Sequence, residues 1–554
     1  MKNNLVFQVP IMHIGQILEN TKKNSLQLAF KEGRRIILYF RDKKVRVATA
    51  KLLQKYAFPE KSYLFFAFIH YAVAQTENIH TNIININNGI LISINPLPGH
   101  NLLILIILEY KRLKLLKKKS FDILDNSDFK ICKTYPETII IPKGLTSEEI
   151  AEVSAFRSKG RIPCITWRHR KLNTYIIRCA QPCVGIQFKR SAADEKLISL
   201  CKSIGQEEIV IFDLRPKTNA RVNILSGGGF EKDWFYKDVK IEFSYIENIH
   251  VVRNSLESLY DYCNTLSASP TTKLSDWQKA LSNCKWLLYQ RSILKCANQI
   301  IEIIRSKKSV IVHCSDGWDR TAQTVSIAQL LLDPYYRTLE GLLNLIEKDW
   351  IQFGHQFATR YGHSIKKLKD HKHTQRSPIF LQFIDLLFQL MQIYPQAFEW
   401  NEDLLLLIME ELYSCKYGTF LFDSTRERLK HNVDETTVSL WTVVLLNKEK
   451  YTNFSYLASK KILYLDLANT PLQLWARYYL HYSEHPMEIF ELIHKHDSHF
   501  SSHPISLSDP HKFATMSYKN RAQVDSSIDQ GADDLTESGS LSFSCSYNNL
   551  KSLE

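Results

Sequence analysis

The stretch Lys308-Ser-Val-Ile-Val-His-Cys-Ser-Asp-Gly-Trp-Asp-Arg-Thr-Ala-Gln323 decides the fold class of this chain. Its β-branched beginning predicts a buried strand, its small and polar middle predicts a loop, and the helical spacing from Thr324 to Leu332 predicts a helix. A strand that runs through a loop into a helix gathers backbone N–H groups at a helix N-terminus, where the helix dipole also favours an anion. The stretch therefore predicts a phosphate-binding loop within an α/β domain.

The residue types inside this loop suit nucleophilic attack on phosphorus. Cys314 follows the strand directly, where the positive field of the loop and helix favours its thiolate form. The planar guanidinium of Arg320 can hold two phosphate oxygens and follow them into the transition state. Gly317 permits a tight turn or a positive φ. We expect Thr321 to hydrogen-bond to the thiolate and His313 to orient the loop through a backbone contact, so we predict Cys314 and Arg320 as catalytic residues that work through a phosphocysteine intermediate.

The proton for the leaving oxygen has no obvious donor on a separate loop, because the sequence contains no Trp-Pro-Asp motif. The nearest acids are Asp316 and Asp319, and Asp319, beside Arg320, is the better candidate for a general acid. Its alternative role is to hold the loop together through hydrogen bonds. Acidic residues here also argue against a loop that uses lysines to attract a highly charged soluble inositol phosphate.

A second Cys-x5-Arg match shows that the bare pattern is a weak signal. It reads Cys164-Ile-Thr-Trp-Arg-His-Arg170, has no glycine, and places bulky or β-branched residues where a phosphate cradle would have to fold. We therefore predict that Cys164 is structural.

Composition and charge describe a globular protein with a polyanionic partner. The chain has 554 residues, 45% of them hydrophobic, and a formal net charge of +14, which favours nucleic acid or an anionic lipid surface. No zinc-finger spacing or RNA-binding aromatic signature supports nucleic acid. Eleven scattered cysteines without C-x-x-C pairs indicate neither disulfides nor a zinc site. We expect a cytoplasmic, reduced protein without metal or cofactor, and no apolar window is long enough to cross a bilayer.

Four segments follow one another along the chain. Residues 1–76 predict a small sheet-rich domain, 77–108 an atypical insertion rich in Asn and Ile, 109–495 an α/β phosphatase domain, and 496–554 a disordered tail. The basic run 111–119, with its interleaved leucines, predicts a solvated element anchored by leucines, and the alternative is a lipid-facing patch. The individual elements expected are strands at 35–40, 62–68, 208–212 and 309–312, helices at 286–304 and 403–414, and a core strand or helix at 102–108.

Residues 313–323, His-Cys-Ser-Asp-Gly-Trp-Asp-Arg-Thr-Ala-Gln, resemble the active-site signature of the myotubularin phosphatases. The resemblance covers about 110–480, and its spacing is most similar to the branch that contains myotubularin itself. Further landmarks of that family stand in the expected order at 156–163, 178–182, 213–216, 227–229, 248–253, 353–355, 377–383 and 412–415.

The resemblance implies a fold and an activity. The fold would be a cysteine-based phosphatase domain similar to protein tyrosine phosphatases, with a central sheet flanked by helices. A small PH-GRAM domain would precede it, apparently truncated here. The activity would be removal of the D3 phosphate from phosphatidylinositol 3-phosphate and phosphatidylinositol 3,5-bisphosphate, without a metal, by a cytoplasmic protein held peripherally on endosomal membranes.

The resemblance also implies which residues meet the lipid headgroup. Asn223, Asn248 and Ile249 match positions that contact the headgroup, and Arg360 matches an arginine expected near the second phosphate. The scissile phosphate would lie in the loop itself, within Cys314, Ser315, Asp316, Gly317, Trp318, Asp319 and Arg320.

Two other functions stay open at this point. A protein tyrosine phosphatase would share the chemistry but needs a separate acid loop and a stacking aromatic residue, and neither is identified. A non-catalytic lipid-binding adaptor that pairs with an active relative is disfavoured by the intact Cys314 and Arg320. The chain has no sustained heptad pattern for a coiled coil. A homo-oligomer and a hetero-oligomer with family members therefore both stay open.

Overall fold

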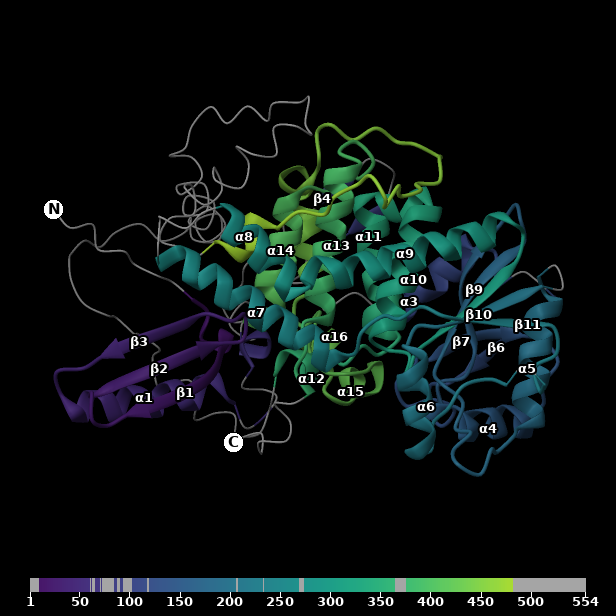
Figure 1. Ribbon diagram of the computed structural model, residues 1–554, viewed down its shortest axis with the longest axis horizontal. Helices are drawn as coiled ribbons and strands as arrows, with labels where there is room; N and C mark the ends of the chain where they lie inside the picture. The colour runs from purple at the N-terminus through teal and green to yellow at the C-terminus, as the bar shows by residue number, and fades with distance from the viewer. Residues whose placement is uncertain are drawn as a thin grey trace. The chain divides into compact units, whose positions relative to one another are not determined.

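A five-stranded sheet carries the segment that opened the sequence analysis, as the computed structural model of the chain shows (Figure 1). The strand order is β11-β10-β12-β9-β8. Four strands are parallel to their neighbours, and β8 is antiparallel to β9. Their bounds are β8 Cys164–His169, β9 Thr174–Cys179, β10 Ile209–Asp213, β11 Val239–Phe243 and β12 Ser309–His313. The structure describes residues 9–59, 61, 65–69, 71, 84–86, 90–92, 102–116, 119–205, 208–232, 234–268, 274–363 and 375–481.

The three inner strands end at the same edge of the sheet. His313 pairs in register with Asp213 on one side and with Cys179 on the other. Every residue of β9, β10 and β12 is buried, as expected for parallel strands covered on both faces. The carboxyl edge of such a sheet is where open α/β folds bind their ligands.

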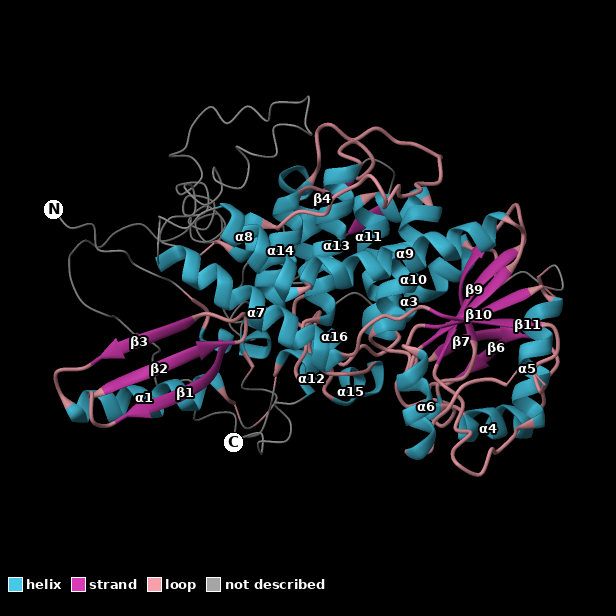
Figure 2. Cartoon of the chain, in the orientation of Figure 1, coloured by secondary structure: helices cyan, strands magenta, loops and turns pink. Residues whose placement is uncertain are grey.

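Helices lie on both sides of the sheet (Figure 2). The most important is α10, Arg320–Leu332, which packs against β12, β9 and α9 and is buried at all of its residues. The other helices before the site are α4 Ser147–Phe156, α5 Ala192–Ser203, α6 Lys217–Leu225, α7 Ile249–Ala268, α8 Leu274–Cys284 and α9 Trp286–Arg305. Those after it are α11 Leu339–Ile346, a π-helical turn Glu347–Gln352, α12 Phe357–Tyr361, α13 Ile379–Ile393, α14 Glu402–Ser414, α15 Thr425–Lys430, α16 Val433–Thr436, α17 Leu440–Leu446 and α18 Ala476–Tyr479.

The N-terminal part is a three-stranded antiparallel sheet with one long helix. Its strands are β1 Ile14–Asn20, β2 Ser25–Phe30 and β3 Arg35–Tyr39, and the helix is α1 Lys43–Ala57, which begins at an Asp42 cap. The strand predicted at 35–40 is confirmed as β3, which ends one residue earlier, at Tyr39. The strand predicted at 62–68 is wrong where the structure describes it, because residues 66–69 are helical. Phe65 and Ala67 are buried there against Leu421 and Cys415, so tertiary packing explains their apolar character.

Two hairpins and one helix lie between the N-terminal sheet and the five-stranded sheet in the sequence. The Asn/Ile-rich segment contains a hairpin, β4 Ile84–Ile86 and β5 Ile90–Ile92, and a helix, α3 Leu102–Arg112. A second hairpin follows, β6 Phe121–Asp125 and β7 Thr138–Pro142. In the basic run, Leu113 and Leu115 are buried while Lys111 and Lys114 are exposed, which confirms the solvated element anchored by leucines.

Two of the predictions fall partly or wholly beyond these residues. Much of the segment 77–108 and all of the tail 496–554 lie outside the described residues. Within the described ranges, no helix is both long enough and apolar enough to cross a membrane.

Candidate active site

The predicted strand, loop and helix are present, with Cys314 directly after β12 and Arg320 at the first turn of α10. Gly317 makes the loop possible. Its φ is +77°, and a Cβ atom built there would lie 2.3 Å from the carbonyl oxygen of Cys179 at the end of β9. No other residue fits this position without moving the central sheet.

The sulfur of Cys314 faces hydrogen-bond donors, although only 3% of the residue is exposed. The backbone N–H of Gly317 donates to the Sγ atom over 3.3 Å, and the Thr321 hydroxyl donates over 3.4 Å. The Thr321 contact is the one expected from the sequence. Donors of this kind stabilise a thiolate more than a thiol.

Arg320 is held over the same loop. Its Nη2 atom donates to the Ser315 hydroxyl over 3.2 Å, and its Nη1 atom donates to the carbonyl of Ile246 over 3.3 Å. The side-chain amide of Asn223, on α6, lies 3.3 Å from the Ser315 hydroxyl oxygen. The structure therefore brings Asn223 to the phosphate loop, and its contact with the headgroup stays a prediction.

Two buried arginines fix the Gly317 carbonyl on the outer side of the loop. Arg161 donates to it over 3.0 Å and Arg178 over 2.9 Å. Arg178 in turn pairs with Asp349 of the π-helical turn, at 2.8 Å. Because this carbonyl is held outward, the N–H of the same peptide, which belongs to Trp318, points to the opposite side.

His313 anchors the beginning of the loop. Its Nδ1 atom lies 3.0 Å from the Cys314 carbonyl oxygen, which is the backbone contact expected, and its Nε2 atom lies 3.1 Å from Glu231. Burial alone would lower the pKa of His313, but the carboxylates of Glu231 and Asp213 outweigh it and raise that pKa. Glu231 also pairs with Arg157 at 2.7 Å, so a buried charge network supports the strand end.

The carboxylate of Asp319 lies between an arginine and a histidine. Arg360 donates to both carboxylate oxygens, over 3.1 Å and 2.8 Å, and His355 lies 3.3 Å from one of them. Burial opposes ionisation of Asp319, yet Arg360 and His355 together hold its pKa well below the usual range. In this geometry Asp319 is ionised and performs the loop-tying role that was the alternative to general acid. Arg360, predicted near a second phosphate, is thereby placed beside the loop.

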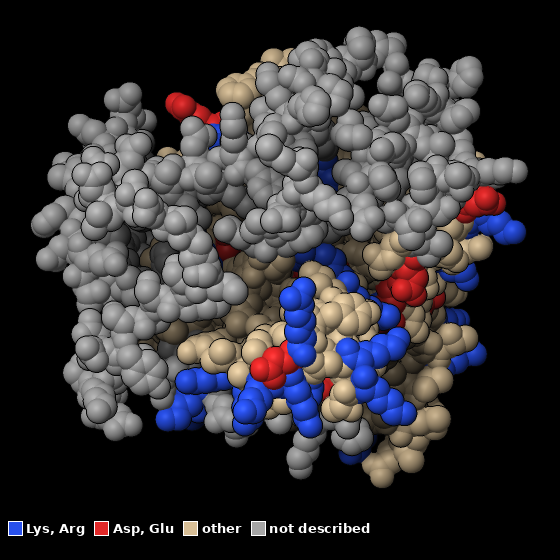
Figure 3. Space-filling model, turned by 90° about the vertical axis from the view of Figure 1, so that its left-hand side faces the viewer, with Lys and Arg blue, Asp and Glu red and all other residues tan. Residues whose placement is uncertain are grey.

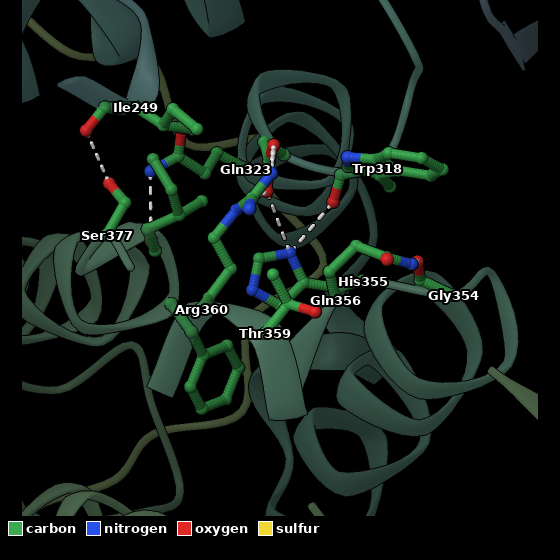
Figure 4. A network of polar contacts seen from close by, with 12 residues as sticks. Ile249, Trp318, Gln323, Gly354, His355, Gln356, Thr359, Arg360 and Ser377 are labelled. Carbon is green, nitrogen blue, oxygen red and sulfur yellow. Dashed lines mark hydrogen bonds and ion pairs between the residues drawn. The ribbon is translucent and has the colours of Figure 1, made fainter. Parts of the chain in front are cut away.

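The remaining loop residues are tied to neighbouring elements. Asp316 accepts a hydrogen bond from the Ser158 hydroxyl at 2.7 Å. Trp318 is half-buried, and its carbonyl lies 2.9 Å from His355 Nδ1 (Figure 4). The guanidinium of Arg161 sits 5.6 Å from the centre of the Trp318 ring.

Asn248 and Ile249 lie near the site but use their polar groups locally. The Asn248 side chain accepts from the backbone N–H groups of His250 and Val251, at 2.9 and 3.2 Å, and so caps the beginning of α7. The Ile249 carbonyl accepts from Ser377 over 2.7 Å (Figure 4). Their connection to the phosphate loop runs through Ile246, whose carbonyl accepts from Arg320.

The second Cys-x5-Arg match is structural, as predicted. Cys164 lies within β8, is fully buried, and donates to the Arg178 carbonyl over 3.6 Å, while Arg170 is exposed beyond the strand. Burial raises the pKa of Cys164 to about 12, so its thiol stays protonated.

Several supporting residues were not assigned roles from the sequence. Gln181 donates its backbone N–H to the Ser315 carbonyl over 2.9 Å, and its side chain accepts from Arg215. Arg215 also pairs with Asp213 at 2.6 Å. The signal that marks this group is position, since Gln181, Arg215 and Cys314 each follow directly or closely after the end of a parallel strand.

A nucleophile position after a central parallel strand, an arginine opening the next helix and a glycine cradle between them define the cysteine-dependent class of phosphatase domains. The family model described as Myotubularin-like phosphatase domain matches residues 82–429. The chain belongs to this family.

Relatives at about two-fifths identity support the same assignment. Myotubularin of Xenopus tropicalis is 40% identical over 362 residues, which are 65% of this chain and 59% of that protein. A Caenorhabditis elegans protein named phosphatidylinositol-3,5-bisphosphate 3-phosphatase mtm-1 is 41% identical over 381 residues, 67% of this chain and 63% of that protein. The mouse protein named phosphatidylinositol-3,5-bisphosphate 3-phosphatase MTMR2 is 40% identical over 382 residues, 68% of this chain and 58% of that protein. The chain thus spans about three-fifths of the length of these relatives.

Proposed function

We propose that this protein removes the 3-phosphate from phosphatidylinositol 3-phosphate and phosphatidylinositol 3,5-bisphosphate. The observation that carries the proposal is the pair of donors on the Cys314 sulfur, the Gly317 N–H and the Thr321 hydroxyl, with the guanidinium of Arg320 over the same loop. The names of the worm and mouse relatives supply the substrate class.

The reaction proceeds in two displacements. The Cys314 thiolate attacks phosphorus in line with the inositol C3 oxygen, the P–O bond to that oxygen breaks, and the leaving oxygen takes up a proton. Loop N–H groups and Arg320 bind the three remaining oxygens through the transition state. Water then attacks the phosphocysteine, the S–P bond breaks, and inorganic phosphate leaves while Thr321 donates to the departing thiolate.

Substrate binding would connect the two predicted roles of Asp319. A second phosphate bound to Arg360 would compete with Asp319 for the guanidinium and remove the strongest partner of the carboxylate. The pKa of Asp319 would then rise, because its burial is no longer compensated, and the group could donate a proton to the leaving oxygen. A monophosphorylated lipid would leave the Asp319–Arg360 pair in place, so its leaving oxygen would take a proton from water and its turnover would be slower.

The N-terminal part and the cellular site belong to the same proposal. The β1–β3 sheet and α1 would form one part of a PH-GRAM domain. The exposed cations of this part include Lys43, Lys44, Lys51 and Lys55 on α1. Figure 3, which views the side where β1–β3 lie in Figure 1, shows Lys and Arg predominating over acidic residues. These exposed cations favour peripheral attachment to anionic membranes, which for this family would be endosomal membranes reached from the cytoplasm. Homo-oligomers or hetero-oligomers with family members stay part of the proposal without a structural feature that supports them.

The test is release of inorganic phosphate from short-chain phosphatidylinositol 3-phosphate and 3,5-bisphosphate by the purified chain. We expect turnover with both lipids, abolished in Cys314→Ser and reduced at least about a hundredfold in Arg320→Met. Faster turnover of a phosphotyrosine peptide than of either lipid would identify a protein phosphatase instead. Lipid binding without any phosphate release would identify a non-catalytic adaptor.

A further inference from the structure

Large apolar side chains are exposed on the segments that flank the phosphate loop. Isolated exposed apolar residues are ordinary, but a group of them on adjoining segments marks a binding surface. The group consists of Ile186 (65% exposed), Phe188 (57%), Val222 (61%), Leu225 (78%) and Trp234 (68%).

Backbone hydrogen bonds join these segments into one surface. The Gly185 N–H donates to the Gly228 carbonyl over 2.9 Å, and the Gly228 N–H donates to the Asn223 carbonyl over 2.8 Å. Residues 184–190, the C-terminal end of α6, residues 226–232 and residues 234–236 therefore pack side by side. We call these residues the rim surface.

Cations are interleaved with the aromatic rings of the rim surface. The ammonium of Lys232 lies 4.3 Å from the centre of the Phe230 ring, 5.5 Å from that of Trp234 and 5.9 Å from that of Phe188. Such contacts hold a long, mobile side chain beside the rings without removing its charge. The same segments and the adjoining α6 carry the exposed cations Lys189, Lys217, Arg221 and Lys237.

One short helix links the rim surface to the chemistry. On α6, Asn223 lies 3.3 Å from the Ser315 hydroxyl of the phosphate loop, while its neighbours Val222 and Leu225 are exposed. The apolar side chains thus begin within one helical turn of a residue that contacts the phosphate loop.

We infer that the rim surface docks on an anionic lipid bilayer, with Leu225, Phe188 and Trp234 inserted among the lipids and the lysines bound to headgroup phosphates. The bilayer interface lies between the apolar lipid chains and the charged headgroups. Tryptophan suits it because its ring is amphipathic, and lysine suits it because an apolar stem carries a charged end. The inference rests on the proposed lipid substrate, because a phosphoinositide headgroup lies at the membrane surface and the site must reach it there. Charge decides for lipid over a second copy of this chain, since two such cationic surfaces would repel each other.

Binding to vesicles tests the inference separately from catalysis. The protein would carry Cys314→Ser, and the vesicles would be phosphatidylcholine alone or phosphatidylcholine with phosphatidylserine, both without phosphoinositide. We expect the double variant Leu225→Ser/Trp234→Ser to weaken binding to both kinds of vesicle about tenfold or more. Lys232→Glu should weaken binding only to the anionic vesicles, and added salt should reduce that difference.

Insertion itself is visible in fluorescence. Lipids with bromine on the acyl chain quench a tryptophan that enters the bilayer, so we expect quenching in the otherwise native chain and its loss in Trp234→Phe. Phe454→Ser is the matched control, because Phe454 is 92% exposed but packs beside residues 395–401 and makes no described contact with the phosphate loop. Phe454→Ser should leave both binding and quenching unchanged.

Activity measurements separate this inference from the proposed function. With Cys314 intact, Leu225→Ser/Trp234→Ser should turn over a dispersed short-chain lipid within about twofold of the wild-type rate, yet lose activity on vesicles. Unchanged vesicle binding in this variant, or a change in oligomeric state alone, would overturn the membrane surface in favour of a protein contact. Absence of turnover on dispersed lipid in the unaltered chain would instead overturn the proposed function, and the binding and quenching results would still stand on their own.

Discussion

Asp319 has two candidate roles, general acid and loop-tying residue, and its hydrogen-bond partners decide between them in the unliganded protein. The sequence places it inside the loop and beside Arg320, where a proton donor would be useful. The structure pairs it with Arg360 and His355, which lower its pKa. At the residue scale, the position of the acid was predictable and its protonation state was not, because Arg360 lies about forty residues further along the chain.

The dependence of rate on the leaving group tests the acid role of Asp319. We expect Asp319→Asn to lower kcat on phosphatidylinositol 3,5-bisphosphate by roughly 10²- to 10⁴-fold, because the inositol oxygen needs a proton. An aryl phosphate leaves without one, so its kcat should fall far less. Equal losses of kcat on both substrates would mean that Asp319 only positions the loop. The matched control is Asp316→Asn, which removes the other carboxylate of the same loop.

Gly317 offers a second prediction at the same scale. Gly317→Ala must keep a φ of +77° and place its Cβ 2.3 Å from the Cys179 carbonyl oxygen. Gly227→Ala is the control, because its φ is +87° but no atom lies within 4 Å of the added Cβ. We expect Gly227→Ala to cost about 1 kcal/mol of unfolding free energy through backbone strain, and Gly317→Ala to cost about 2 kcal/mol more and to abolish turnover. Equal denaturant midpoints for the two variants would contradict the steric account.

Elements with a strong period were predictable from sequence. The helices predicted at 286–304 and 403–414 are α9 and α14, and the latter begins where the Asn401 side chain caps it. The strand predicted at 62–68 failed because Phe65 and Ala67 are buried by residues near 415 and 421, which no local pattern reveals. The roles of Arg178 and Asp349 could not be predicted for the same reason. Strand register and the π-helical turn bring these two residues together.

The π-helical turn supports the phosphate loop through an intermediate residue, Arg178. Asp349 on this turn pairs with Arg178, and Arg178 donates to the Gly317 carbonyl. We expect Arg178→Met to cost about 3–5 kcal/mol of stability, because it leaves the Asp349 carboxylate without this cation in a buried site. Adding Asp349→Asn should restore part of that loss, which a double-mutant cycle by urea denaturation would measure.

An exposed ion pair supplies the control for this cycle. Lys196 and Glu149 lie 2.7 Å apart at the surface, and Lys196→Met should change stability by less than about 1 kcal/mol. Equal effects of Lys196→Met and Arg178→Met would show that the connection through Asp349 contributes nothing.

On the scale of the whole molecule, the turn that precedes β1 contacts segments that follow the active site in the sequence. Met12 packs with Leu421 and Val433, and the ring of His13 lies 5.7 Å from that of Tyr413. Lys31 stands within this contact, and its ammonium nitrogen is buried without a hydrogen-bond partner among the described residues. This contact could not be predicted from the sequence, which indicates only a small sheet-rich domain in this region.

Burial lowers the pKa of Lys31 to about 8 from 10.5, so its charge destabilises the folded chain at neutral pH. The penalty is complete below pH 8 and disappears as the pH rises above 10.5, where both folded and unfolded chains are neutral at this site. We therefore expect Lys31→Met to raise the free energy of unfolding by about 3 kcal/mol at pH 7. Denaturant unfolding at several pH values would show the gain shrinking as the pH rises, whereas Lys51→Met, exposed on α1, should change little.

The outward-held carbonyl of Gly317 has a consequence for temperature as well as for rate. Arg161 and Arg178 donate hydrogen bonds to that oxygen before any lipid binds. The dipole of the Gly317–Trp318 peptide is therefore already oriented when the phosphate reaches the sulfur. The electrostatic rearrangement that water would undergo around a developing anion has been completed during folding. Lower temperature or molecular crowding should thus slow the encounter with the lipid far more than it alters the geometry of the phosphate loop.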